Sequence, residues 1–327
     1  MRDDAVAPVI AVMLILAAAG TFLAIFNGIY IPSFKQASEI EHLHNVESSF
    51  QHFSSDIEQA VAARQDHMLL SEPVQMGGGD FIFNTLKSSG SLSVMNEQNP
   101  VYYLTLYDDT GTVLGGIDGT IVNISYEPQG NFWQDQGYRW QYGYLNVTKY
   151  HTLQSPLKHY TMTQVNNEFK STSSLATFAG SFGSAEYTIN QTLLQNTTPT
   201  PDNRFIFSPQ GGNCSCIDLW AVNISASPDH QFISSNGFGT LELKSTITSV
   251  RYFGASAITV GSDREPFGNA TFMNWNSSFT TLARTCESNI RYNPEYSHED
   301  FSIYTIEQEV NPVNVTLNIV NIEIGAY

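Results

Sequence analysis

The motif Asp109-Thr110-Gly111-Thr112 has the residue types that a pair of catalytic aspartates uses in acid proteolysis. That reaction needs two carboxylates that share one proton and come from two lobes or two chains. The other candidate, Asp118-Gly119-Thr120, lacks the Asp-Thr-Gly order and lies in the same series of short apolar runs. Asp and Gly between two apolar runs are also usual in a tight turn, where Gly adopts a positive φ. We therefore expect a turn and no enzymatic activity, with proteolysis by Asp109 as the competing hypothesis.

Three histidines, His42, His44 and His52, share a stretch with helical periodicity. Two metal ligands on one helix face are four residues apart, and no pair of these histidines has that spacing, so we expect them to be solvated. His298-Glu299-Asp300 could bind Ca²⁺ with backbone carbonyls, but a solvated loop is the simpler interpretation. The chain contains no P-loop, dinucleotide-binding glycine pattern or nucleophile elbow. The sequence therefore predicts neither a metal site nor a cofactor.

The chain contains three cysteines, Cys214, Cys216 and Cys286. In an exported protein, Cys286 can form a disulfide with one of the first two and leave the third thiol free. Three free thiols are one alternative. A metal site is another, but the Cys-x-Cys pair has no second pair of thiolates or imidazoles at metal-ligand spacing. We expect the disulfide, and the spacing does not choose between Cys214 and Cys216.

An aromatic-rich stretch contains Trp133, Tyr138, Trp140, Tyr142 and Tyr144. Aromatic rings can form a flat platform that binds a sugar, and they also supply most of the buried area in the core of a small β domain. We favour core packing and keep a surface glycan as a possible ligand of the sugar-binding alternative.

The chain is rich in the N-x-S/T sequence that accepts N-linked glycans. Its frequency is about twice what the Ser and Thr content produces by chance, although the same residues are common in β turns. The excess favours a glycosylated domain that faces the outside of the cell. The nine candidate asparagines are Asn123, Asn146, Asn190, Asn196, Asn213, Asn223, Asn269, Asn276 and Asn314.

The overall charge excludes one large class of partner. The 327 residues contain 14 Lys and Arg against 31 Asp and Glu, which gives a formal net charge of −17. Binding to DNA or RNA requires clustered basic side chains, so we expect no nucleic-acid partner. The apolar fraction of 42% is enough to build a core, and an acidic surface suits an exported protein in a salty medium.

The element that must position these residues begins with an uncharged apolar run over 5–31. About 20 apolar residues span a bilayer as a helix, and this run is too long for the apolar core of a signal peptide. We expect a single-pass membrane anchor over 5–31, ended by Pro32, and a second, amphipathic helical segment over 33–70. The helical part of the chain would then comprise residues 1–72, and the remainder, 73–327, would lie outside the cell.

The second helical segment carries apolar residues every three or four positions, which is typical of one buried helix face. This face would pack on a sheet, and a two-stranded coiled coil is the alternative. Glu39 is expected to lie off this face. The apolar positions are Ile40, Leu43, Val46, Phe50, Phe53, Ile57 and Val61.

From residue 73 onward, short β-branched and aromatic runs alternate with Gly, Asn, Asp and Pro. Such spacing is typical of antiparallel strands in a sandwich or barrel, and the clean alternation over 313–319 predicts a last strand with one buried face. The polar stretch 188–203 would be an exposed loop that divides the domain into two halves. The fold class we expect is therefore α+β, with a long N-terminal helix and a mainly antiparallel, sandwich-like β domain.

The N-terminal stretch from Asp3 to Leu14, DDAVAPVIAVML, resembles the start of archaeal type IV pilin-like proteins. In that family an acidic step leads to A-V-S-P-V-I-G-V-M-L and a long apolar helix; here Ala7 and Ala11 replace the usual Ser and Gly. The stretch 119–149 also resembles large, pilin-related archaeal surface proteins, through a Gly-led strand followed by N-x-[FYW]-x-D-Q-x-Y-x-[YW]-x-x-G.

The resemblance implies a minor pilin or pseudopilin-like subunit of a surface filament, with a structural or adhesive role. Its partners would be the membrane and other pilin-like subunits. The helix would carry assembly, through Pro8, Val9, Val12 and Leu16. The alternative is an anchored, non-polymerising glycoprotein whose outer domain binds a sugar or a peptide.

Overall fold

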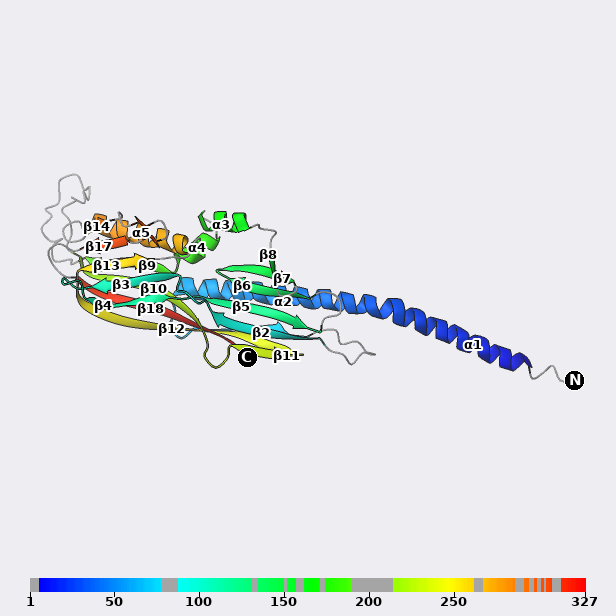
Figure 1. The fold of residues 1–327 in the computed structure, drawn as a ribbon. Coiled ribbons are helices and arrows are strands. Elements are labelled where there is room, and N and C mark those ends of the chain that lie inside the picture. Colours follow the sequence, from blue (N-terminus) through cyan, green and yellow to red (C-terminus); the bar gives the residue numbers. More distant parts are fainter. Residues whose placement is uncertain are drawn as a thin grey trace, which may run out of the picture.

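The chain folds into an elongated head from which one long helix projects (Figure 1). The computed structural model describes residues 6–77, 88–130, 135–149, 152–156, 162–170, 174–189, 214–261, 267–285 and 313–327, together with the short segments 291–293, 297–298, 301–302 and 304–307. The α+β class is confirmed, because a long apolar N-terminal helix precedes a mostly antiparallel β-rich remainder.

The projecting helix is continuous through Pro32, the residue that closes the apolar run. Helix α1 (Val6–Ile25) leads through a π-helical turn, η2 (Phe26–Tyr30), into α2 (Ile31–Ala63). Proline cannot donate an amide N–H and its ring crowds the carbonyl four residues earlier. The wider π turn accommodates this defect, and the Ile31 N–H bonds to the Phe26 carbonyl five residues back.

Helix α2 ends at Ala63 rather than near residue 70. Arg64, the residue that caps it, has a φ of 46° in the left-handed region, which reverses the chain and starts strand β1 (Leu69–Gln75). The apolar helical periodicity also stops at Val61. The residues from 64 to 72 therefore belong to the head, and the predicted helical part of the chain is too long at this end.

The described part of the head contains three large sheets. The first has the order β1-β12-β18-β10-β9 and is antiparallel except for the parallel neighbours β10 and β18. The second has the order β11-β2-β5-β6-β7-β8, and the third β14-β17-β13-β3-β4. The remaining bounds in the first sheet are β12 (Phe238–Ala255), β18 (Val313–Ala326), β10 (Cys214–Ala226) and β9 (Gly183–Ile189).

The other strands are shorter. Those of the second sheet are β11 (Phe232–Ser235), β2 (Ser89–Asn96), β5 (Val122–Gln129), β6 (Gln136–Gln141), β7 (Tyr144–Lys149) and β8 (Thr152–Pro156). Those of the third are β14 (Arg291–Asn293), β17 (Tyr304–Glu307), β13 (Ala257–Gly261), β3 (Tyr102–Tyr107) and β4 (Val113–Gly119). The pair β15 (Ser297–His298) and β16 (Phe301–Ser302) completes the described strands.

Each large sheet contains strands from both sides of residues 188–203. The head therefore does not divide there into two consecutive halves, as the polar loop suggested. The loop itself lies almost wholly outside the described residues. Helices α3 (Met162–Lys170), α4 (Ser174–Gly180) and α5 (Phe267–Thr285) form a layer beside the sheets, and α5 packs on both α4 and β9.

The first sheet is the centre of the head because its long strands bury different faces at their two ends. In β18, Val315 and Leu317 are buried on one face, whereas Ile322 and Ile324 are buried on the other. Strands of 14 and 18 residues in β18 and β12 exceed the usual length. The two ends of β12 and β18 thus pack against different layers of the head. One layer lies nearer the projecting helix and the other lies farther from it.

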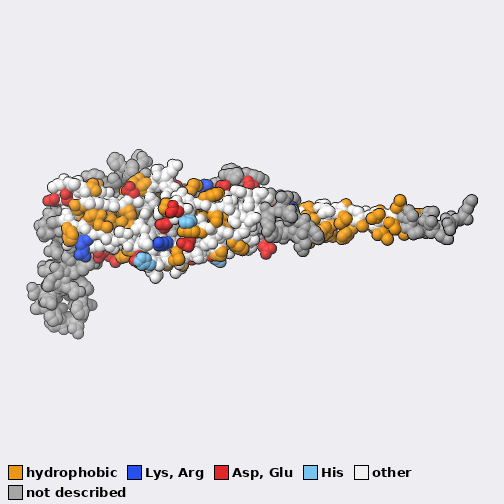
Figure 2. Space-filling model, turned by 90° about the horizontal axis from the view of Figure 1, so that it is seen from below, with side chains coloured by type: hydrophobic (Ala, Val, Ile, Leu, Met, Phe, Trp, Pro, Cys, Tyr) orange, Lys and Arg blue, Asp and Glu red, His pale blue; other side chains and the backbone are white. Residues whose placement is uncertain are grey.

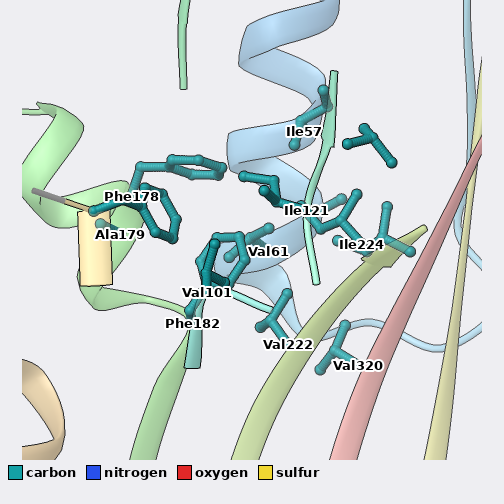
Figure 3. Close-up of a cluster of buried hydrophobic side chains, with 14 of the residues drawn as sticks. Ile57, Val61, Val101, Ile121, Phe178, Ala179, Phe182, Val222, Ile224 and Val320 are labelled. Atoms are coloured by element: carbon teal, nitrogen blue, oxygen red, sulfur yellow. The ribbon is translucent and has the colours of Figure 1, made fainter. Parts of the chain in front are cut away.

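The core joins the helix to these sheets. Ile57 and Val61 of α2 lie beside Ile121, which precedes β5, and beside Ile224 of β10 and Val320 of β18 (Figure 3). All five side chains are almost completely buried. Removing such side chains from water stabilises the fold by about 1.5–3 kcal/mol each. The C-terminal half of α2 is therefore part of the head's core, and the helix does not end at the surface of the head.

Candidate functional site: the exposed apolar helix and its attachment to the head

The projecting helix exposes apolar side chains along the face seen in Figure 2. Val12, Met13, Leu14, Ile15 and Leu16 are consecutive, and each is more than half exposed. Five consecutive residues cover a full turn of an α-helix, so this is not the single apolar stripe of a helix on a protein surface. The helix is long and apolar enough to cross a membrane.

Water alone is a poor environment for this surface. About a dozen large apolar side chains of the helix are exposed, and each costs about 1.5–3 kcal/mol in water relative to an apolar environment. The sum is on the order of 20 kcal/mol or more, which exceeds the stability of most domains. An apolar cover over α1 would remove this cost.

Of the predicted assembly residues, Val12 and Leu16 are exposed, at 56% and 66%. Pro8 and Val9 lie in the first turns of α1, where proline is tolerated; their side chains are outside the described part. Farther along, the rings of Phe22, Phe26 and Tyr30 stack at centroid separations of 6.1 and 6.2 Å. Of these residues, tyrosine is the type that is enriched where a helix leaves the apolar layer.

The aromatic stretch attaches α2 to the head. Trp140 is 1% exposed, and its indole N–H donates a hydrogen bond of 2.9 Å to the Ser54 hydroxyl. The ring of Tyr138 packs against Phe50, and burial raises the pKa of Tyr138 to about 12, so its hydroxyl keeps its proton. These contacts favour core packing over a sugar-binding platform; Trp133 lies outside the described residues.

Side chains of α2 also cover the free edge of β1. The Ser49 hydroxyl donates to the Pro73 carbonyl at 2.8 Å, and His42 Nε2 lies 2.8 Å from the Gln75 carbonyl. An uncovered strand edge is a template for pairing with another chain. The helix thus satisfies outward-facing carbonyls of β1 and anchors itself to the sheet through its polar residues as well as through its apolar face.

The prediction that His42 is solvated is wrong, and so is the placement of Glu39 off the buried face. His42 is 2% and Glu39 5% exposed, because the end of β1 and Tyr126 of β5 cover this side of the helix. Burial lowers the pKa of His42 despite its hydrogen bond to Gln75 and the nearby Glu39 carboxylate. Ile40, expected on the apolar face, is 52% exposed.

Asp108, not Asp109, organises the predicted turn. One Asp108 carboxylate oxygen accepts hydrogen bonds from the Thr110 and Thr112 amides and from the Thr110 hydroxyl, which lowers the pKa of Asp108. Gly111 has a φ of 81°. Asp109 is exposed in this turn, so the local geometry is that of turn chemistry.

The sequons occupy very different environments. Asn314 is exposed, whereas Asn146 is completely buried in β7, and a glycan on its amide would have no path to solvent. We therefore remove Asn146 from the predicted glycosylation sites. Asn123, Asn223 and Asn276 are half-buried. Asn269 lies in α5 but its side chain is not described, and Asn190, Asn196 and Asn213 lie outside the described residues.

The predicted disulfide is not found among the residues that the structure describes. Cys216 is a free thiol, Cys286 lies outside the described residues, and the side chain of Cys214 in β10 is not described. Within the described ranges, no group of three His, Cys, Asp or Glu side chains could hold a metal ion. His298 is in β15, and Glu299 and Asp300 lie outside the described residues.

A cavity of about 610 Å³ lies where the end of α2 meets α3, α4 and α5. No local pattern in the sequence predicts this cavity, because its lining residues come from helical regions that are distant from one another in the chain. The Arg64 guanidinium lines it and donates hydrogen bonds to Ser184 at 2.7 Å and Glu186 at 3.2 Å, and it lies 5.1 Å from the Trp220 ring. The lining residues are Val61, Ala62, Arg64, Phe169, Ala176, Thr177, Gly180, Ser181, Ala270 and Asn274.

Comparisons with known proteins found no matching family model, no matching curated protein and no matching solved structure. Two features of the chain itself point to its function. One is the fully apolar helix, and the other is its continuation into the core of the head.

Proposed function

We propose that this chain is a membrane-stored subunit of an archaeal type IV pilus-like surface filament, with a minor, structural or adhesive role. The apolar half of the helix anchors the chain in the membrane with the head outside. In the filament, the same half packs against the helices of other subunits. The observation that carries the proposal is the continuity of α1, η2 and α2: a surface that needs an apolar cover leads without a linker into the core of a large head.

This continuity supports assembly over anchoring alone. A plain anchor needs only about 20 apolar residues and can be joined to its domain by any flexible linker. Here the helix runs from Val6 to Ala63 and inserts Phe50, Phe53 and Ile57 into the head. Packing between helices in an apolar setting relies on close van der Waals fit, and a rigid connection then sets the position of each head.

The test compares two sets of substitutions on opposite sides of α1. Val9, Val12 and Leu16 lie within about 60° of one another around the helix, and Ile10, Leu14 and Ile25 form a similar group on the far side. Each group is changed to threonine in a protein tagged at its C-terminus. Both changes remove similar apolar surface, so retention in the membrane should fall by similar amounts in the two variants.

We expect wild-type protein to co-purify with surface filaments and the Val9/Val12/Leu16 variant to be depleted from them more strongly than from the membrane. The Ile10/Leu14/Ile25 variant should be depleted less from the filaments. A tagged protein that stays wholly in the membrane fraction, while filaments form normally in a strain without the gene, would defeat the proposal. That result would leave an anchored outer domain.

The second candidate function is that anchored outer domain, acting as a non-polymerising receptor. The cavity beside Arg64 favours it, because its volume lies in the range of small-molecule sites. The receptor would retain a small ligand in the membrane fraction, and substitution of the cavity residue Ala270 by Phe would abolish retention. If the chain is a filament subunit without receptor activity, the wild-type protein and the Ala270→Phe variant should retain equal amounts of the ligand.

A further inference from the structure

Strand β12 has one edge paired with β18 and one edge turned away from it. Thr240 and Tyr327 exchange both of their backbone hydrogen bonds, at 2.7 and 2.8 Å, so the even-numbered residues of β12 face β18 up to Tyr252. The odd-numbered residues therefore direct their N–H and C=O groups to the opposite edge. The Ser245 N–H confirms this, because it bonds to the Met68 carbonyl on that side.

The chain covers most of this outer edge itself. Strand β1 pairs with β12 from Phe238 to Lys244. The turn before β1 then covers the next two outward amides, since Ser245 bonds to Met68 and the Ile247 N–H bonds to the Asp66 carboxylate at 2.9 Å. Beyond Ile247, no described segment pairs with the outer edge.

The open part of the edge spans Thr248–Tyr252 and exposes the N–H and C=O groups of Ser249 and Arg251. It lies in the part of β12 that runs toward the end of the head away from the projecting helix (Figure 1). Val250 and Phe253 are 37% and 67% exposed. A β-branched and aromatic strand with free backbone groups can accept a further strand.

We propose that this open edge of β12 binds an extended acidic segment of a partner protein, which adds to the first sheet as a further strand. The row of alternating N–H and C=O groups fits a polypeptide backbone and no other common ligand. Arg251 makes no ion pair with any described carboxylate, so it is available to an acidic side chain directly opposite. Val250 and Phe253 supply apolar contacts for β-branched residues of the segment.

A second copy of this chain is a poorer occupant. In an antiparallel pairing centred on Arg251, that residue would lie directly opposite its own copy, and like charges opposite each other destabilise a strand pair.

The test uses the full chain in detergent micelles and a fluorescent nine-residue peptide, EVTVEVTVE, whose backbone can pair with the edge and place Glu near Arg251. We expect saturable binding, seen by fluorescence anisotropy. Arg251→Pro removes an outward N–H that has no partner in the head and should weaken binding at least tenfold. Lys244→Glu is the matched control, because its backbone faces β18, and it should leave binding unchanged.

A charge exchange keeps the test independent of folding. At an ionic strength that screens the net charge of −17, Arg251→Glu should bind the lysine peptide KVTVKVTVK more tightly than EVTVEVTVE, the reverse of the wild-type order. Equal binding of EVTVEVTVE to wild type and Arg251→Pro would overturn the proposal, and so would a wild-type protein that shows no saturable binding. Sedimentation that reveals a wild-type dimer, lost in Arg251→Pro, would also overturn it and assign the edge to a second copy.

Discussion

Replacing Phe50 by alanine tests whether α2 is part of the head's core. Phe50 is 2% exposed and packs against the Tyr138 ring at a centroid separation of 6.4 Å. Removal of a buried phenylalanine ring costs about 3–5 kcal/mol, from lost burial and from the cavity that remains. In a domain larger than about 150 residues, each kcal/mol lowers the melting temperature by about 2–4 °C. The expected decrease is therefore roughly 6–20 °C.

The matched control is Ile40→Ala on the same helix. The sequence pattern places Ile40 on the same apolar face as Phe50, but Ile40 is 52% exposed, and exposed substitutions change stability by about 0.5 kcal/mol or less. Melting of the full chain in detergent is followed by near-ultraviolet circular dichroism, which reports the packing of aromatic rings. Similar decreases for the two variants, or a Phe50→Ala change below about 2 °C, would refute the attachment of α2 described above.

Three further outcomes follow from the same geometry. Trp140→Phe removes the hydrogen bond to Ser54 and should destabilise the head by about 1 kcal/mol, whereas the same change in a Ser54→Ala background should cost less, as a double-mutant cycle would measure. The pKa of His42 is lower in the folded chain than its usual 6.5, so the folded state binds fewer protons than the unfolded state. The free energy of unfolding should therefore decrease as the pH falls below about 6.5. Urea titrations should show a smaller decrease for His42→Gln. Glycopeptide mapping of native protein should find sugar on the exposed Asn314 and none on the buried Asn146; a glycan on Asn146 would contradict the placement of β7.

The helical part of the chain was largely predictable because its signals are local. Periodicity over α2 identifies Leu43, Val46 and Phe53 as buried, and periodicity reflects only which residues share a helix face. It cannot say where along the helix the head begins. Ile40 and His42 differ by only two residues, yet the first is exposed and the second is covered by Gln75 and Tyr126, which are distant in sequence.

The arrangement of strands was less predictable because pairing in the first sheet is non-local. The parallel neighbours β10 and β18 bring Cys216 opposite Asn314, and no local pattern in either strand selects that partner. The alternation in β18 predicts one buried face, but the strand buries both faces in turn. The cavity beside Arg64 and the open edge of β12 were missed for the same reason, since each depends on which distant elements come together.

The rigidity of the helix connects the proposed assembly to the open edge. A residue-long defect at η2 changes the hydrogen-bonding pattern but leaves the helix continuous, and from Glu39 to Val61 one face of α2 lies in the core of the head. Because no linker separates the apolar half from the head, the packing of neighbouring α1 helices would fix the orientation of every head. The open edge of β12 would then point in a defined direction on each subunit. Substitutions in α1 and substitutions at the edge should nevertheless have separate effects, because the two surfaces lie on different parts of the chain. Helix substitutions should remove the subunit from filaments and leave peptide binding in micelles intact, whereas Arg251→Pro should do the reverse.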